Sequence, residues 1–438
     1  MSVRPERTAL RALARACALA LAATMAGHVR ADALPQAEAR FSDEAARVGR
    51  VLELANERLA LMPGVAAWKW QHRAPVSDAA RERLVVAAAV GQGAPLGLAA
   101  PALERLFALE IELAREEESG LERRWRSRGY DFAGRVPSLA GEVRPRLDRL
   151  TSELLRALYL AAPAFARADF AARYAPAAAR ELASEGWSDA SRRALLEDLA
   201  GIRLTATPAL RRIDAAHVLR IGTTGDYAPF SAESHGRLAG ADIALARALA
   251  RDLGAEPVFV RTSWPTLVDD LKRSDFDLAI GGISATPARA AAGALSVPYA
   301  FSGKTLIARC RDAARLDSLA AIDRPDVRVI VNPGGTNERY VRAHLKRARI
   351  RLFPSNATIF GELLAGRADV MITDDVEVDL ATRRHPQLCR SFPGTLTHEG
   401  KVILMARDPQ LAKVVDAWLR GALAAGTPAR LLEQALAR

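Results

Sequence analysis

The chain has 438 residues and a formal net charge of +11 at pH 7, with 26% charged and 5% aromatic residues. The length predicts more than one domain, because single hydrophobic cores stop growing at about 250–300 residues. The basic residues are scattered and form no nucleic-acid-binding motif. We therefore expect no nucleic-acid partner, and interpret the charge as a general attraction for small anions.

The first residues have the pattern of a secretory signal peptide. An apolar run from Ala16 to Ala26 follows four arginines and is too short to span a bilayer. Small residues that suit cleavage stand at 24–26 and at 31–33. We predict a signal peptide over residues 1–33 and a periplasmic protein that has no membrane contact once this segment is removed.

Residues 34–205 have the pattern of an all-α domain. Helix-forming Ala, Leu, Arg and Glu dominate, and apolar residues recur at steps of three and four, as in Val48, Val51 and Ala55. Longer helical runs cover 102–126 and 147–160.

From about residue 217 short apolar, β-branched runs alternate with helical stretches. The predicted strands cover 219–224, 257–262, 278–284, 327–332, 350–354 and 369–373. This alternation indicates βαβ units and mostly parallel sheets, so we assign residues 206–438 to an α/β domain. In an oxidising compartment, Cys310 and Cys389 are expected to form a disulfide.

Polar residues gather where these strands end, which is where open parallel sheets bind ligands. Arg289 is suited to grip a carboxylate, and the turn at 334–337 opens a helix whose free N–H groups attract anions. The predicted ligand-binding residues are Asp226, Trp264, Ser284, Thr286, Arg289, Asn332, Thr336, Asn337 and Asp374. The alternatives are ordinary turns, helix caps at Asp226 and Asp374, and a surface ion pair at Arg289.

The motifs LRIGTTGDY (219–227), TSWPTL (262–267), GGIS (281–284) and VNPGGTNE (331–338) carry a family resemblance. Residues 219–432 resemble periplasmic amino-acid-binding proteins, and more closely cyclohexadienyl dehydratases. The resemblance implies one lobe of about 217–305 plus 404–438, and a second of about 306–403.

The dehydratase resemblance also implies a reaction. Those enzymes remove water and CO₂ from prephenate or arogenate, giving phenylpyruvate or phenylalanine, with no metal or cofactor. Glu338 is taken to match the family's catalytic acid. Asp374 occupies a position that binds an amino group in related receptors, which keeps arogenate as a candidate substrate.

The helical half carries a second resemblance, over about 40–165. RLALMPGVAAWKW (58–70) and PVSDAARE (75–82) are similar to exported all-α chorismate mutases, which are commonly homo-oligomers. The residues expected to bind or rearrange chorismate are Arg58, Lys69, Asp78, Arg81, Glu82 and Glu118. Ala114 and Val85 depart from the polar residues of relatives, which puts the activity in doubt.

Together the two halves predict a bifunctional enzyme that turns chorismate into prephenate and then acts on prephenate or arogenate. The competing hypothesis is a periplasmic binding protein for an aromatic or amino acid, with a helical dimerisation module.

Overall fold

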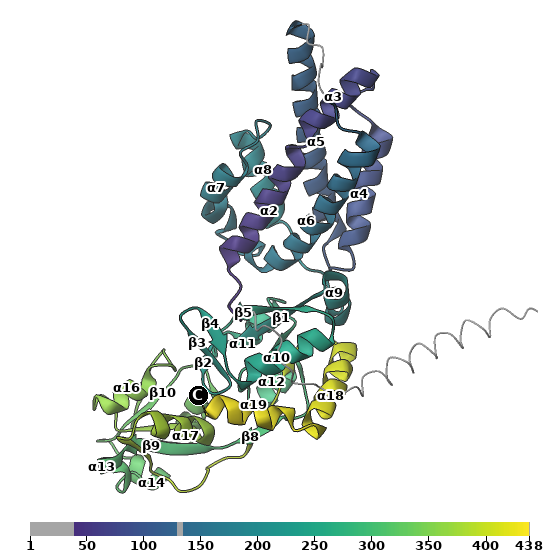
Figure 1. Ribbon diagram of the computed structural model, residues 1–438. Helices are drawn as coiled ribbons and strands as arrows, with labels where there is room; N and C mark the ends of the chain where they lie inside the picture. Colours follow the sequence, from purple (N-terminus) through teal and green to yellow (C-terminus); the bar gives the residue numbers. More distant parts are fainter. Residues whose placement is uncertain (1–38, 129–134, 438) are drawn as a thin grey trace, which may run out of the picture.

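A computed structural model describes residues 39–128 and 135–437, so the predicted signal peptide lies outside the described residues. The predicted fold class is confirmed: a helical region precedes a two-lobed α/β domain (Figure 1). In the described part of the chain, no helix is long and apolar enough to cross a membrane.

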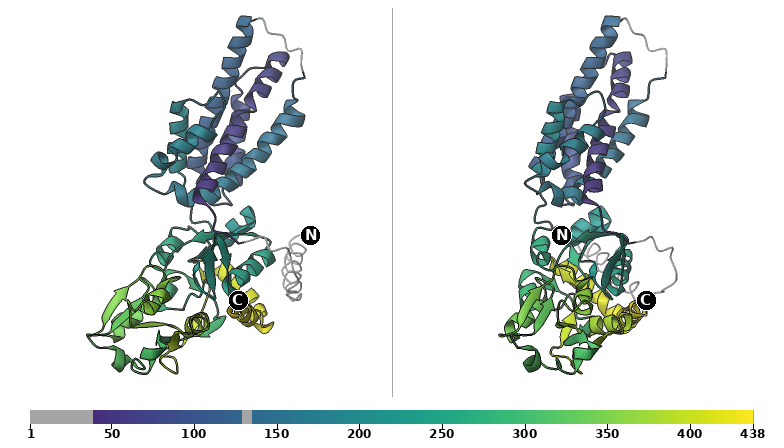
Figure 2. Two further views of the ribbon diagram at one scale, coloured as in Figure 1. Left: turned by 60° about the vertical axis from the view of Figure 1, so that its left-hand side comes forward. Right: turned by 90° about the vertical axis from the view of Figure 1, so that its left-hand side faces the viewer.

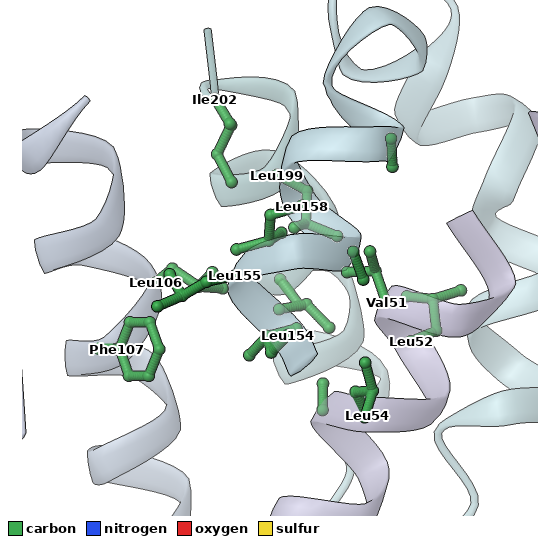
Figure 3. Packing of buried hydrophobic residues seen from close by; sticks show 14 of the residues in the cluster. Val51, Leu52, Leu54, Leu106, Phe107, Leu154, Leu155, Leu158, Leu199 and Ile202 are labelled. Carbon is green, nitrogen blue, oxygen red and sulfur yellow. The ribbon is translucent and has the colours of Figure 1, made fainter. Parts of the chain in front are cut away.

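The helical region is held together by apolar helix faces. Its elements are α2 (Glu44–Leu59), α3 (Met62–His72), α4 (Ala79–Gly93), α5 (Ala100–Arg128), the π-helix η1 (Leu139–Val143), α6 (Arg144–Phe165), α7 (Phe170–Glu181) and α8 (Asp189–Ala200). Asp43 starts α2 by accepting a hydrogen bond from the Ala45 amide at 2.9 Å. Figure 3 shows Val51, Phe107 and Leu154 pointing into one core between α2, α5 and α6.

The first lobe is built on a five-stranded sheet of order β5-β1-β6-β15-β7. Its strands are β1 (Val218–Thr223), β5 (Glu256–Arg261), β6 (Leu278–Ala279), β7 (Ala294–Leu295) and β15 (Leu404–Met405). A small sheet contains β2 (Asp226–Tyr227), β3 (Ser231–Ser234) and β4 (Arg237–Ala239). The helices of this lobe are α10 (Ala241–Asp252), α11 (Leu267–Lys272), α12 (Pro287–Ala292), α18 (Pro409–Ala424) and α19 (Thr427–Leu436).

The second lobe repeats this plan with the order β11-β10-β12-β9-β13. Its strands are β9 (Lys304–Arg309), β10 (Arg328–Val331), β11 (Arg349–Leu352), β12 (Val370–Asp374) and β13 (Leu388–Arg390). Its helices are α13 (Cys310–Ala313), α14 (Leu319–Ile322), α15 (Thr336–His344), α16 (Ile359–Leu364) and α17 (Asp375–Arg384). A disulfide joins Cys310 to Cys389.

All six predicted strands are present as β1, β5, β6, β10, β11 and β12, and β1 and β10 pair in parallel with their neighbours. The lobes are joined where β8 (Ala300–Ser302) and β14 (Glu399–Lys401) pair antiparallel. The chain therefore crosses between lobes just before β9 and just after β14.

The helical region contacts the first lobe through a buried polar cluster, which we call the Asp277 cluster: Tyr159, Arg212, Arg220 and Asp277. Arg212 lies on α9 (Ala209–Ala216), which leads into β1. Asp277 accepts hydrogen bonds from Arg220 Nη2 at 2.7 Å, from Arg212 Nη2 at 3.3 Å and from the Tyr159 hydroxyl at 3.2 Å. Figure 2 shows the helical region standing on the first lobe, away from the second.

Candidate active site

A cavity lies between the two lobes, at the carboxyl ends of the strands. Its lining contains seven of the predicted residues, namely Trp264, Ser284, Arg289, Asn332, Thr336, Asn337 and Asp374. It also contains Tyr227, Gly282, Gly335, Asn356 and Glu377. Strands of both lobes end here because each sheet has a parallel core, so the arrangement follows from sheet topology.

Arg289 is a buried cation that forms no ion pair with a carboxylate of residues 39–128 or 135–437. Its residue is 4% exposed, and Nη1 donates to the Ser284 carbonyl oxygen at 2.7 Å. Its guanidinium carbon lies 5.7 Å from the centre of the Trp264 ring. Burial lowers the pKa of Arg289 to about 10, so the guanidinium stays charged at neutral pH. Asp374 and Glu399 offset part of this charge from a distance, and a buried guanidinium with no carboxylate in direct contact fits an anionic ligand.

Three predicted residues stand outside the cavity lining. Thr286 is the N-cap of α12 and accepts from the Arg289 amide at 3.3 Å. Asp226 accepts from Trp264 Nε1 at 3.2 Å, which fixes the indole ring beside the cavity. Both therefore position ligand-facing residues. Burial raises the pKa of the Asp226 carboxyl.

Glu338, the third, is held as a carboxylate. Its Oε2 accepts from the Gly334 amide at 2.7 Å, and its Oε1 accepts from Arg342 Nε at 2.8 Å. The Gly334 amide and then Arg342 lower the pKa of Glu338. The position of Glu338 in the first turn of α15 also favours the charged form, whereas the predicted role as catalytic acid needs the protonated form.

Glu377 has the opposite environment. It is 5% exposed, lines the cavity, and accepts hydrogen bonds from Asn356 Nδ2 at 3.1 Å and from the Thr373 hydroxyl. Burial raises the pKa of Glu377 to about 8, and Asp374 adds to the rise. Glu377 is therefore a neutral carboxylic acid at pH 7 inside the cavity.

Sequence reasoning missed both Glu377 and Asn356. Glu377 follows the strand-end residue Asp374 by three positions at the start of α17, so both side chains leave the same side of the helix. That spacing was available from the sequence. Asn356 follows β11, and its Nδ2 also donates to the Asp226 carbonyl oxygen at 3.0 Å, which joins the two lobes.

Comparison with known proteins agrees with this architecture. Residues 219–437 match the model of the bacterial extracellular solute-binding proteins, family 3. The chain is 44% identical over 236 residues to cyclohexadienyl dehydratase of Pseudomonas aeruginosa, covering 52% of this chain and 88% of that protein. The chain belongs to the family 3 solute-binding proteins.

More distant relatives share the solute-binding fold. L-cystine-binding protein TcyJ of Escherichia coli (strain K12) is 24% identical over 209 residues, which is 47% of this chain and 78% of that protein. A crystal structure of an amino acid ABC transporter substrate-binding protein from Streptococcus pneumoniae, bound to L-arginine, superposes with a TM-score of 0.50 at 24% identity. It covers 52% of this chain and 98% of that one.

The helical region, outside the matched solute-binding residues, has an apolar cavity of its own. Of the predicted residues only Arg58 lines it, together with Val85, Glu110 and Ala114. Arg58 donates to Glu110 Oε2 at 2.7 Å and to Thr151 Oγ1 at 2.6 Å. Its charge is thus already balanced by Glu110, which the sequence analysis did not single out.

Lys69 and Glu118 form a separate, partly buried ion pair at 2.6 Å, between α3 and α5. Glu118 is 4% exposed, and burial raises the pKa of its carboxyl against the opposing effect of Lys69. Lys69 also donates to the Val76 carbonyl oxygen at 2.7 Å.

The three residues around the start of α4 serve as a helix cap. Asp78 is the N-cap and accepts from the Arg81 amide at 3.0 Å, while Glu82 Oε1 accepts from the Asp78 amide at 3.3 Å. The Arg81 side chain is exposed and does not line the cavity of the helical region. Asp78, Arg81 and Glu82 therefore do not line the cavity that Arg58 lines, although Glu82 lies close enough to Glu118 to help raise its pKa.

Proposed function

We propose that the solute-binding domain is a cyclohexadienyl dehydratase in the periplasm. The observation that carries the proposal is a neutral carboxylic acid, Glu377, in the same cavity as the unpaired cation Arg289. The 44% identity to an enzyme of that name supports it. The substrate class is a cyclohexadienyl acid with a second carboxylate on its side chain, as in prephenate or arogenate.

The chemistry needs one proton donor and one anion-binding group. Arg289 binds the side-chain carboxylate and fixes the ring in the cavity. The bond from the ring to its own carboxylate breaks and CO₂ leaves, and the electron pair enters the ring. The C–O bond of the ring hydroxyl breaks as Glu377 donates its proton, so that water leaves and the ring becomes aromatic. Solvent then returns a proton to Glu377.

The competing function is a receptor for an amino acid, as the name of the L-cystine-binding relative suggests. A receptor gains nothing from burying a carboxyl group without a cationic partner, because desolvation costs stability. Incubating the purified protein with prephenate separates the two functions. Phenylpyruvate formation, followed by its absorbance, supports the enzyme, and ligand-induced stabilisation without turnover supports the receptor.

Arg289 offers a direct test of substrate binding. We expect Arg289→Met to raise KM for prephenate by about 10²-fold, because a buried charge pair with the carboxylate is lost. Steady-state kinetics measure this. Arg251→Met is the matched control, since Arg251 is exposed on α10, pairs with Asp252 and does not line the cavity. It should change KM by no more than about threefold, and equal effects of both variants would contradict the role of Arg289.

For the helical region we propose chorismate mutase activity, supported by the buried Lys69–Glu118 pair. A protonated Glu118 and Lys69 would both donate to oxygens of the rearranging ether, which needs orientation and charge stabilisation only. A substrate carboxylate would displace Glu110 from Arg58, which weakens binding. The product, prephenate, would then be the substrate of the solute-binding domain. We further propose a homo-oligomer, which sedimentation analysis of the full chain tests.

The pH profile of mutase activity tests Glu118. Its pKa is raised by burial, so the donating, protonated form is present at low pH and is lost as pH rises through that pKa. We expect chorismate consumption by the wild type to fall between about pH 5 and 8, and Glu118→Gln to keep its rate across that range. Loss of chorismate absorbance measures both. A flat wild-type profile with no gain in the variant would contradict this role.

A further inference from the structure

The residues immediately before α2 pair with the first lobe. Ala39 forms an antiparallel bridge with Leu238 of β4, and Phe41 forms a parallel bridge with Phe259 of β5. The Leu238 amide donates to the Ala39 carbonyl oxygen at 2.7 Å, and the Ser42 amide donates to the Phe259 carbonyl oxygen at 2.8 Å. Figure 1 shows the start of the purple chain running from the first lobe up into α2. The chain therefore enters the helical region from the first lobe and returns to that lobe through α9.

Phe41 packs against the turn that precedes Asp226. A Cβ atom at Gly225 would lie 2.8 Å from the Phe41 ring, so the ring touches the backbone of this turn and leaves no room for a side chain there. The guanidinium carbon of Arg261 lies 3.8 Å from the centre of the Phe41 ring. Arg261 also pairs with Glu233 at 2.5 Å, and the Glu233 amide donates to the Gly225 carbonyl oxygen at 2.7 Å. Phe41, Arg261 and Glu233 thus support the turn together.

The same turn forms part of the cavity between the lobes. Asp226 accepts from Trp264 Nε1 at 3.2 Å, and the next residue, Tyr227, lines the cavity. Trp264 also lines the cavity, and its ring centre lies 5.7 Å from the guanidinium carbon of Arg289. A displacement of the turn therefore moves the indole ring that lies beside the anion-binding arginine.

We propose that Phe41 is a positioning residue for this cavity and acts through the turn at 224–227 on the indole ring of Trp264. The segment ahead of the helical region is then a working part of the solute-binding domain. The kinetic consequence of the proposal rests on the proposed dehydratase function. KM should change and kcat should change little, because the turn supports substrate binding, whereas the proton donor Glu377 stands on α17 of the second lobe.

Hydrogen exchange of the full-length protein gives the first test, and it does not depend on turnover. In Phe41→Ala the amides of residues 224–233 are expected to exchange at least about tenfold faster than in the wild type, because the turn loses its support. Leu210→Ala is the matched control, since Leu210 is also half-buried against the same apolar cluster but lies on α9, at the other junction. It should keep the exchange of these amides within about threefold of the wild type. Unchanged exchange in Phe41→Ala, or equal effects of the two variants, would overturn the proposal.

Steady-state kinetics with prephenate give the second test. We expect Phe41→Ala to raise KM at least about tenfold with kcat within about threefold, and Leu210→Ala to keep both within about threefold. An unchanged KM in folded Phe41→Ala, or a fall in kcat as large as the rise in KM, counts against the positioning role. If circular dichroism shows that Phe41→Ala does not fold, Phe41→Leu takes its place in both tests with the same criteria. Absence of turnover by the wild type overturns the dehydratase function instead, and hydrogen exchange then decides the proposal.

Discussion

Replacing Glu377 with glutamine is expected to lower kcat for prephenate dehydration by a factor of about 10²–10⁴, the usual contribution of a positioned general acid. The amide has nearly the same shape, its oxygen can still accept from Asn356, and its NH2 group can donate to the Thr373 hydroxyl oxygen once that hydroxyl turns, so the fold and KM should change little. Steady-state kinetics with prephenate measure both parameters.

The pH dependence adds a second readout for Glu377. Its pKa is raised to about 8 by burial, so the proton-donating form is present below that pH and is lost as pH rises through it. The wild-type rate should therefore be level near pH 7 and fall above about pH 8. The residual activity of Glu377→Gln should lack this fall.

Glu338→Gln is the matched control, since it makes the same change at a carboxylate that is held ionised outside the cavity lining. The family resemblance assigns Glu338 as the catalytic acid, and in that role the variant would keep binding and lose turnover. The geometry leads us to expect a rate within about threefold of the wild type. A large loss in Glu338→Gln, with normal turnover in Glu377→Gln, would restore the first assignment.

Asp277→Ala is expected to lower the free energy of unfolding by about 3–5 kcal/mol, because it leaves Arg220 and Arg212 buried without their counter-ion. Burial alone would raise the pKa of Asp277, but Arg220 and Arg212 outweigh it and lower the pKa. The carboxylate's contribution is thus present above its unfolded pKa and is lost as pH falls through the folded value. Urea unfolding followed by circular dichroism measures the change.

Two further variants separate charge from shape in the Asp277 cluster. Tyr159→Phe removes a single hydroxyl donor and should cost about 1 kcal/mol. Asp269→Asn alters an exposed pair with Lys272 and should stay within about 0.5 kcal/mol. A loss in Asp277→Ala no larger than that in Asp269→Asn would contradict a stabilising role for the cluster.

Much of the fold follows from local patterns. The six strands were predicted from short apolar runs. Such runs are typical of strands that are buried on both faces of a parallel sheet, so they can be recognised without knowing the topology. β15 escaped prediction because it is a two-residue strand that returns from the second lobe, and its pairing with β6 and β7 depends on topology. Pairing between strands so far apart in the sequence leaves no recognisable pattern in the residues of β15 itself.

The residues of the candidate site also fall into a group that the sequence predicts and a group that it does not. Arg289 and Thr336 follow predicted strands directly, so their place in the cavity could be foreseen. The roles of the carboxyl groups could not be foreseen, because the protonation state of each carboxyl group depends on how deeply it is buried. Glu338 stands in a recognisable motif but meets the Gly334 amide and Arg342, which lower its pKa, whereas burial in the cavity wall and nearby carboxylates raise the pKa of Glu377. Asp78 was likewise predicted to bind substrate from its spacing in the sequence, but in the structure it is the N-cap of α4.

The Asp277 cluster also limits how this protein can be divided for study. Arg212, Arg220 and Asp277 belong to the solute-binding half, whereas the Tyr159 ring that covers Arg220, 4.5 Å from its guanidinium carbon, belongs to the helical half. A fragment that begins at the linker would expose two arginines, one carboxylate and the apolar surface around them to water. We therefore expect each half expressed alone to be less stable than in the full chain, so the two proposed activities are better separated by substitutions within the full chain.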